Sequence, residues 1–287
     1  MPANQTRLYA DVEFLTSIQP ARNYHNLASL NKAADYIKAE FAKLSSARVT
    51  EQPFHAEGRP YRNIIASFGP PEAERIILGA HYDVCGDQPG ADDNASAVAG
   101  LLETARLLHE QRPSLFRRLD FVAYPNEEPP YFATDHMGSA VHARALYEQK
   151  VRVRAMICYE MIGYFSDAPG SQRFPDERLA NLYPHTGNFI IVVGKTGQEE
   201  IVEQMQALMH KHTTLDVQRI NLPPSLGLAS LSDHRNYWKH GYQAVMINDT
   251  SFLRNPNYHQ PTDTIDTLDF KRMAEVVNGV WGAILEL

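Results

Sequence analysis

Short apolar runs alternate with longer amphipathic segments along most of the chain. The runs are the right length for buried strands and cover residues 75–80, 118–124, 154–159, 188–194 and 244–248. Apolar positions with helical spacing fill the stretches between and after them, over residues 96–111, 138–149, 197–212 and 269–285. Parallel neighbouring strands need crossover helices, so this rhythm predicts an α/β fold with a mixed, mostly parallel central sheet and helices on both faces.

The first quarter of the chain adds a helix and two strands to this pattern. Apolar residues from Leu30 to Phe41 have helical spacing and predict a helix over residues 30–44, and residues 49–69 alternate like a pair of strands. No internal repeat, low-complexity tract or long linker interrupts the sequence. We therefore expect a single domain over residues 1–287.

Composition and charge narrow the class of protein. Apolar residues make up 44% and charged residues 21%, as in an ordinary soluble globular protein. The net charge of -7, with no basic run, argues against nucleic acid or an anionic membrane as the main partner. The first residues lack a secretory-signal pattern, and no apolar run approaches the roughly 20 residues of a membrane span, so we expect a cytoplasmic protein. Cys85 and Cys158 are too few for a disulfide framework and are expected to be reduced.

Residues capable of metal binding and acid-base chemistry follow three of the predicted strands. They are His81 and Asp83 after the first run, Glu127 and Glu128 after the second, and Glu160 after the third. Taken singly, each has a plain explanation, because a histidine after a strand is usually structural and acidic pairs are usually solvated. Ligands of open α/β sheets bind at the carboxyl ends of the strands, so the convergence predicts a functional site there.

The residue types favour a zinc site. Imidazole and carboxylate ligands suit zinc, and the cysteines have no CxxC spacing. His81 and Asp83 are two residues apart, so both point to the same side of an extended segment, with His81 as a ligand and Asp83 fixing its tautomer. Of the adjacent pair, one of Glu127 and Glu128 can bind a metal while the other faces a metal-bound water.

Six blocks in this order resemble the co-catalytic zinc aminopeptidases of clan MH. They are HYD at residues 81–83, GADDNAS at 90–96, NEE at 126–128, CYEMIGY at 158–164, SDH at 232–234 and NYHQPTDT at 257–264. The resemblance is to the bacterial leucyl aminopeptidase type, which has glutaminyl cyclases and glutamate carboxypeptidases as relatives. It covers almost the whole chain.

The resemblance implies two zinc ions per chain. Asp93 would bridge them, His81 and Glu160 would complete one site, and Glu128 and His259 the other. Many members of the clan have aspartate at the Glu160 position, so the longer side chain departs from the usual pattern. A cis peptide bond after Asp93 is also implied.

The remaining roles concern catalysis. The resemblance makes Glu127 the general base, which takes a proton from a metal-bridging water and returns it to the leaving amine. Tyr258 would donate to the developing oxyanion or else simply pack, and Asp233 with His234 would support the site or line the cleft. The loop after Glu128, residues 129–137, is longer than usual, and its Tyr131 and Phe132 either shape the substrate pocket or pack in the core.

These inferences predict an aminopeptidase that removes the N-terminal residue of a peptide or aminoacyl substrate. One alternative is a single-zinc glutaminyl cyclase on the same fold, although that branch usually has tryptophan where Tyr258 stands. The other is a metal-binding module without catalysis. A complete ligand set and an intact Glu127 argue against the second alternative.

Overall fold

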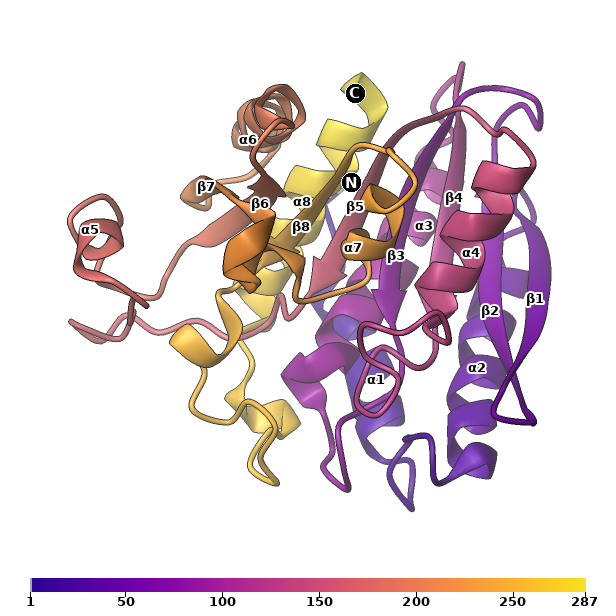
Figure 1. Cartoon of the computed structure of the whole chain (residues 1–287), viewed down its shortest axis with the longest axis horizontal. Helices are drawn as coiled ribbons and strands as arrows, with labels where there is room; N and C mark the ends of the chain where they lie inside the picture. The colour runs from indigo at the N-terminus through magenta and orange to yellow at the C-terminus, as the bar shows by residue number, and fades with distance from the viewer. Residues whose placement is uncertain (1) are drawn as a thin grey trace.

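One eight-stranded sheet forms the centre of the protein in the computed structural model, which describes residues 2–287 except for the side chain of Pro224 (Figure 1). Its spatial order is β1-β2-β4-β3-β5-β8-β6-β7. The strands are β1 (Arg48–Ala56), β2 (Arg59–Phe68), β3 (Arg75–His81), β4 (Arg118–Tyr124), β5 (Val153–Glu160), β6 (Ile190–Lys195), β7 (Val217–Leu222) and β8 (Ala244–Asn248). β4, β3, β5 and β8 are parallel neighbours, so their carboxyl ends share one edge.

Antiparallel pairs lie toward both sides of this parallel centre. β1 pairs with β2, β2 with β4, and β6 with β8 in antiparallel fashion, whereas β6 and β7 are parallel. The β1–β2 connection is a two-residue turn in which Glu57 and Gly58 both have positive φ, at 50° and 77°. This is the turn conformation that matches the twist of a hairpin. The predicted strand pair is thus confirmed.

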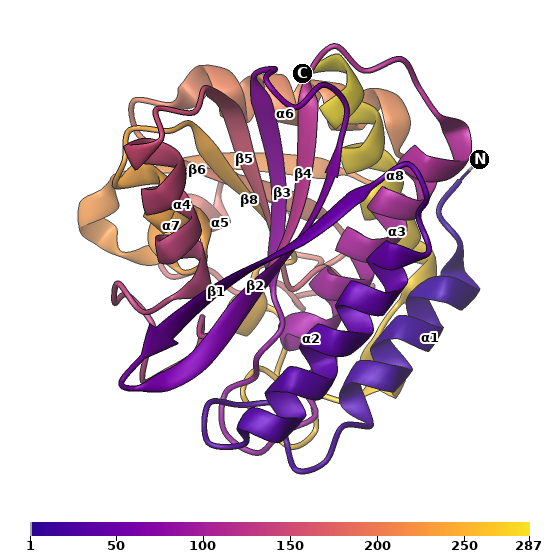
Figure 2. The ribbon, with the colours of Figure 1, turned by 90° about the vertical axis from the view of Figure 1, so that its right-hand side faces the viewer.

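Helices cover both faces of the sheet (Figure 2). One layer contains α1 (Gln5–Thr16), α2 (Leu27–Ala42), α3 (Ala97–Gln111), α6 (Glu199–His212) and α8 (Phe270–Glu286), whose apolar residues join one large core cluster. The opposite layer contains α4 (Gly138–Glu148) and the short α7 (His234–Trp238), which join a second cluster. A further single-turn helix, α5 (Glu177–Ala180), lies outside both layers. The predicted α/β fold with a mixed sheet and helices on both faces is confirmed.

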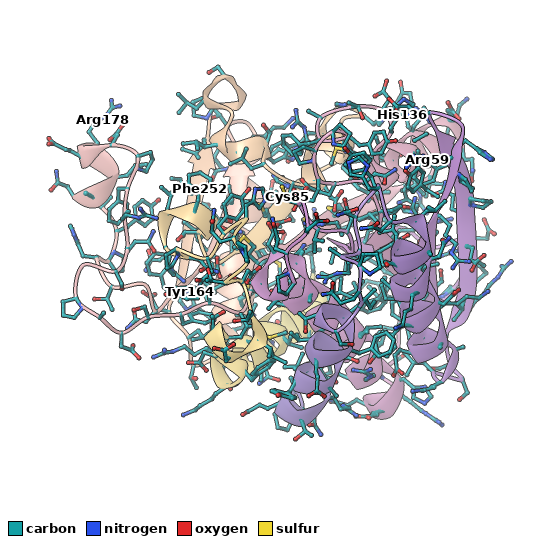
Figure 3. The ribbon with its side chains drawn as sticks, turned by 90° about the horizontal axis from the view of Figure 1, so that it is seen from below. Arg59, Cys85, His136, Tyr164, Arg178 and Phe252 are labelled. Carbon is teal, nitrogen blue, oxygen red and sulfur yellow. The ribbon has the colours of Figure 1, made fainter. Side chains whose placement is uncertain are left out.

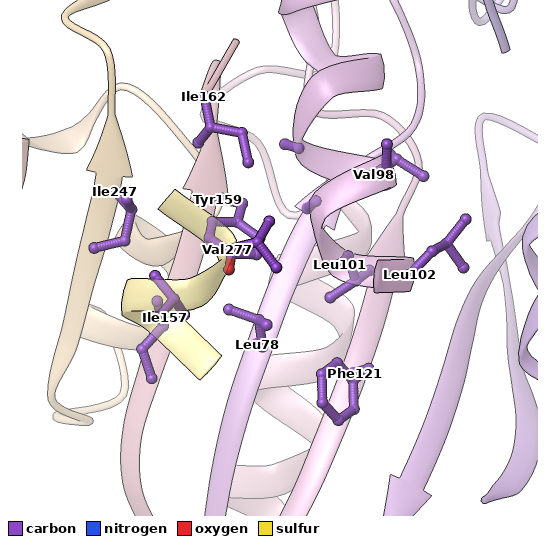
Figure 4. Close-up of a cluster of buried hydrophobic side chains, with 14 of the residues drawn as sticks. Leu78, Val98, Leu101, Leu102, Phe121, Ile157, Tyr159, Ile162, Ile247 and Val277 are labelled. Atoms are coloured by element: carbon purple, nitrogen blue, oxygen red, sulfur yellow. The ribbon is translucent and has the colours of Figure 1, made fainter. Parts of the chain in front are cut away.

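The larger core explains why the central strands contain almost only apolar residues. Figure 4 shows Leu101 of α3 and Val277 of α8 on either side of Leu78 of β3, with Ile157 of β5 next to Val277. All four side chains are fully buried or nearly so. Each such side chain contributes about 1.5–3 kcal/mol on burial, so the parallel strands form a rigid base for the residues at their ends.

Several elements were not predicted from the sequence. They are α1, the edge strand β7 and the short helices α5 and α7. The α1 signal was present, because Leu8, Val12 and Leu15 have helical spacing and are fully buried, and Asn4 caps the helix by accepting hydrogen bonds from Thr6 and Arg7. Within residues 2–287 we find no helix with the length and apolar character that crossing a membrane requires.

Candidate active site

The strand ends bring the predicted site residues together. His81 and Glu160 are the last residues of β3 and β5, and Glu127 and Glu128 follow β4 after a short turn. Because β3 lies between β4 and β5, these residues face one another at the carboxyl edge. Asp93 reaches the same place from the turn before α3, and His259 from the segment after β8.

Asp93 lies between two histidines, one on each side. Its Oδ1 is 3.4 Å from Nε2 of His81, and its Oδ2 is 3.0 Å from Nε2 of His259. His81 Nε2 is also 3.4 Å from Oε2 of Glu160, and His259 Nε2 is 3.4 Å from Oε2 of Glu128. The structure therefore presents two sets of one histidine and one carboxylate, with Asp93 common to both.

Several polar atoms of these side chains are buried without a hydrogen-bond partner. They are both ring nitrogens of His81, Oδ1 of Asp93, Oε1 of Glu127 and Oε1 of Glu128. Leaving buried polar atoms unpaired is costly, and a cation bound between them removes that cost. Two divalent cations would also balance the charge of the four carboxylates of Asp93, Glu127, Glu128 and Glu160. The donor set of imidazole and carboxylate thus fits zinc.

Without a metal, the site retains protons. Burial raises the pKa of Glu128 to about 8 and raises that of Glu127 well above its ordinary value. Burial alone lowers the pKa of His259, but the neighbouring Asp93 and Glu128 outweigh it and raise the pKa to about 10. His81 behaves in the same way beside Glu160, Asp83 and Asp93. Metal binding at this site would therefore displace protons.

Asp83 organises two strand ends at once. Its Oδ1 lies 3.4 Å from Nδ1 of His81, as expected for the residue that fixes the tautomer. Its two oxygens also accept hydrogen bonds from the backbone N–H groups of Glu127 and Glu128, each at 3.1 Å. This second contact was not predicted, and it joins the end of β3 to the glutamate pair.

Two further residues orient the residues expected to bind metal, and both were missed at the sequence level. Ser232 donates a hydrogen bond to Oε2 of Glu160 at 2.6 Å. Asp263 accepts hydrogen bonds from the backbone N–H groups of Asp92 and Asp93, at 2.9 and 3.1 Å. Both belong to the recognised blocks SDH and NYHQPTDT, so their position in those blocks was the available signal.

The backbone turn that positions Asp93 has an unusual conformation, which a glycine and an arginine make possible. The peptide bond between Asp93 and Asn94 is cis, as predicted. Gly90 has φ of 60°, and a Cβ there would lie only 2.3 Å from the backbone oxygen of Asp93, so only glycine fits. The buried guanidinium of Arg22, which was also missed, donates to the backbone oxygens of Pro89 and Gly90.

The other two residues of the SDH block, Asp233 and His234, are both buried but have different surroundings. Asp233 is buried, and burial raises its pKa to about 7. His234 turns away from the carboxylates, because its Nε2 bonds to the backbone oxygen of Ala229 at 2.6 Å and its ring packs edge-on against Trp238. Burial lowers the pKa of His234 to about 4, so this imidazole is neutral.

Tyr258 lies directly against the site. Its ring stacks on that of His259, with 3.8 Å between the centroids. Burial and the carboxylates of Asp93 and Glu128 raise its pKa, so the hydroxyl keeps its proton. Among the described residues, none forms a hydrogen bond with this hydroxyl.

An apolar cavity of about 120 Å³ opens beside Glu160 and Tyr258. Its walls come from β6, β7, β8 and the segments around α5, and include Phe189, Ile191, Val193, Met246 and Phe252. The loop of residues 129–137 does not contribute to this cavity. Tyr131 of that loop is instead buried against Tyr24 and Tyr61. Of the two roles that the sequence left open for Tyr131, the structure therefore supports packing and not pocket formation.

Neither cysteine is in a disulfide, as predicted. Cys85 also lies beside the site, because it follows the end of β3 by only a few residues. Its Sγ and ligand atoms of Glu128 and His259 all lie within 4.8 Å of one another. Figure 3, which views the carboxyl edge from below, places Cys85 near the middle of this face, between Phe252 and His136.

Comparison with known proteins supports the fold and shows the family of the chain. The sequence profile of peptidase family M28 matches residues 63–284, and the chain belongs to this family. It is 47% identical to the uncharacterized protein YfbL of Escherichia coli (strain K12) over 286 residues, covering 97% of this chain and 87% of that protein. It is 28% identical to the probable aminopeptidase YDR415C of Saccharomyces cerevisiae, covering 81% of this chain but 59% of the yeast protein.

Solved structures of two kinds of enzyme, an aminopeptidase and a glutaminyl cyclase, share the fold of this chain. The LapA aminopeptidase of Legionella pneumophila superposes with a TM-score of 0.78 at 20% identity, covering 99% of this chain and 72% of that one. The glutaminyl cyclase of Bacteroides thetaiotaomicron superposes with a TM-score of 0.75 at 21% identity, covering 100% and 99%. Fold similarity alone thus does not separate the two reactions.

Proposed function

We propose that this protein is a two-zinc aminopeptidase that removes the N-terminal residue of peptides. The single observation that carries the proposal is that the two oxygens of Asp93 face two different histidines, each paired with its own glutamate. His81 and Glu160 would hold one zinc ion and Glu128 and His259 the other, with Asp93 shared. A single-zinc site would not need two such sets.

Bound zinc ions would polarise the scissile carbonyl, acidify a water molecule and coordinate the free α-amine of the substrate. The protein supplies the proton transfer. Glu127 is buried beside both ligand sets, with Oε2 at 3.9 Å from Nε2 of His81 and Oε1 unpaired. In our proposal its carboxylate accepts the proton of the attacking water and delivers it to the leaving amine.

Tyr258 and the apolar cavity would position the substrate. The protonated Tyr258 hydroxyl is free to donate to the oxygen that gains charge during attack. The cavity beside Glu160 and Tyr258 would take the side chain of the N-terminal residue. Its lining by Phe189, Ile191 and Met246 favours an apolar side chain over a charged one.

A substrate panel separates this function from its alternatives. Purified protein, metal-replete or treated with a chelator, is incubated with leucyl amide, N-acetyl-leucyl amide and a peptide that begins with glutamine. An aminopeptidase hydrolyses leucyl amide only in the metal-replete form and leaves the acetylated substrate intact. Cyclisation of the glutamine peptide with one zinc ion per chain would identify a cyclase, and metal binding without turnover would identify a non-catalytic module.

A further inference from the structure

Arg235 is a cationic side chain next to the candidate active site. Arg235 lies in the first turn of α7, two residues after the buried Asp233, and is half-buried. Its guanidinium carbon lies 4.8 Å from the centre of the Phe132 ring. Among the described residues, none accepts a hydrogen bond or forms an ion pair with this side chain.

Other arginines that are withdrawn from solvent in this protein are bonded. The guanidinium of Arg22 donates to four backbone oxygens, and that of Arg106 pairs with the carboxylates of Asp11 and Glu40. Partial burial of a guanidinium without such partners costs free energy, which an aromatic ring offsets only in part. The open donors of Arg235 therefore point to an anionic group that is supplied from outside the chain.

Contacts place Arg235 on the side of the site where Glu127 and Glu128 lie. The loop that carries Phe132 starts at Glu128, because the backbone N–H of Phe132 donates to the backbone oxygen of Glu128 at 3.2 Å. Burial lowers the pKa of Arg235, and the Glu127 carboxylate acts against this shift. Arg235 and Phe132 thus lie near the proposed general base.

The apolar cavity lies on the other side. It is bounded by Glu160 and Tyr258, and neither Glu127, Phe132 nor Arg235 lines it. In Figure 3, Phe252 of the cavity wall and His136 of the 129–137 loop lie on opposite sides of Cys85. If the N-terminal side chain occupies the cavity, the rest of the substrate extends toward the loop and Arg235.

The reaction itself orients the substrate in the same way. Glu127 must reach the nitrogen of the leaving residue to protonate it, so that residue lies on the Glu127 side. In a dipeptide the leaving residue itself carries the free carboxylate, and each further residue moves that carboxylate by at most about 3.6 Å. A short peptide therefore brings its carboxylate into the region of Arg235, whereas a long one carries it past.

We propose that Arg235, held by the Phe132 ring, binds the C-terminal carboxylate of the substrate, so that the preferred substrates are dipeptides and tripeptides. This inference rests on the proposed aminopeptidase function and deepens it. A planar guanidinium binds a carboxylate through two parallel hydrogen bonds, which a peptide amide cannot accept in the same geometry. The longer 129–137 loop thereby acquires a function, because it supplies Phe132.

The test compares substrates that differ only at the far end. We measure kcat and KM for leucyl-glycine and for its amide, leucyl-glycinamide. The wild-type protein should favour the free acid by about tenfold or more in kcat/KM, the effect of one charge-assisted contact. Arg235→Gln should bring the ratio close to one, mainly by raising KM for the acid, and Arg235→Lys should restore only part of it because the fork is lost.

Lys239→Gln is the matched control. Lys239 lies one helical turn after Arg235 and carries the same charge, but it pairs with Asp135 at 3.7 Å. This variant should keep the wild-type ratio, because the proposal depends on contact and not on long-range charge. Phe132→Leu provides a second route if Arg235 variants fold poorly, and it should raise KM for the acid more than for the amide.

Three results would overturn the inference. They are a wild-type acid-to-amide ratio near one, an equal loss on both substrates in Arg235→Gln, and an equal change of the ratio in Lys239→Gln. Any of these would leave the aminopeptidase function in place as long as leucyl-glycinamide is hydrolysed. Failure to hydrolyse either substrate in the metal-replete form would instead contradict the proposed function itself.

Discussion

Ser232 donates a hydrogen bond of 2.6 Å to Oε2 of Glu160, the same oxygen that faces His81. The hydroxyl fixes the orientation of a carboxylate whose side chain is one methylene longer than the aspartate expected at this position. The contact thus explains how the longer side chain of Glu160 is held in place at the end of β5. Outer contacts of this kind orient a ligand and strengthen metal binding.

Removal of this contact should weaken one metal site more than the other. We expect Ser232→Ala to lower the affinity of the His81–Glu160 site by about 10- to 100-fold, with activity restored by added zinc. Metal content after dialysis and activity against zinc concentration measure the effect. Ser230→Ala is a suitable control, because the Ser230 hydroxyl forms a solvent-exposed hydrogen bond to the backbone oxygen of Gly227. Unchanged metal affinity in Ser232→Ala would show that the hydrogen bond does not support the ligand.

The metal-free protein should lose stability as the pH rises. Burial raises the pKa of Glu128 to about 8 and that of Asp233 to about 7, so the folded protein keeps protons that the unfolded chain releases near pH 4. A group whose pKa is raised on folding makes its full contribution to the stability of the folded protein below the pKa of the unfolded chain. This contribution is lost as the pH rises through the pKa of the folded protein. His259, with a pKa of about 10, acts in the same direction.

Thermal unfolding in the presence of a chelator between pH 6 and 9 tests this expectation. Tm should fall across the range, and Asp233→Asn should flatten the fall because one of the titrating groups is gone. Asp93, whose pKa is lowered by His259 and His81, is ionised throughout and does not alter the slope. A metal-free Tm that rises between pH 6 and 9 would contradict the proton-retaining site.

The two thiols should differ in reactivity. Cys158 is fully buried, and burial raises its pKa well above its ordinary value, whereas Cys85 is only partly buried, with its pKa raised to about 12. In the folded, metal-free protein a thiol reagent at pH 8 should modify Cys85 slowly and leave Cys158 unmodified, and both should react after unfolding. Cys85→Ser should abolish the native reaction. A single reactive thiol in the unfolded wild type would contradict two reduced cysteines.

The sequence predicted the parts of the fold that depend on local pattern. The buried strands around His81, Glu127 and Glu160 are short and apolar, so both the sheet and the convergence of residues at its edge followed from spacing alone. The ordered blocks added Asp93 and His259, which reach the site from loops and which periodicity cannot place. Edge strand β7 was missed because its residues are only partly buried, which leaves a weak apolar pattern.

The features of the site that could not be predicted from the sequence depend on contacts between segments far apart in the chain. Ser232 meets Glu160, Asp263 meets the backbone of Asp93, and Arg235 meets Phe132 only because the chain folds these segments together. None of these pairs has a sequence spacing that predicts it. The cavity beside Glu160 likewise depends on side chains from β6, β7, β8 and the segments around α5.

The two adjacent glutamates, Glu127 and Glu128, have different proposed tasks. Glu128 lies 3.4 Å from His259 and is the proposed ligand, whereas Glu127 lies farther from His81, at 3.9 Å, and is the proposed base. The most direct test combines kcat on leucyl amide with metal stoichiometry for Glu127→Gln and Glu128→Gln. Gln has nearly the size of Glu but cannot accept the proton and is a poor ligand.

We predict that Glu127→Gln retains two zinc ions per chain while kcat falls by about 10² to 10⁴-fold, the usual contribution of a general base. Glu128→Gln should lose zinc from one site. If Glu127→Gln kept near-wild-type kcat, or if it were the variant that lost metal, the assignment of base and ligand, and with it the proposed mechanism, would be contradicted.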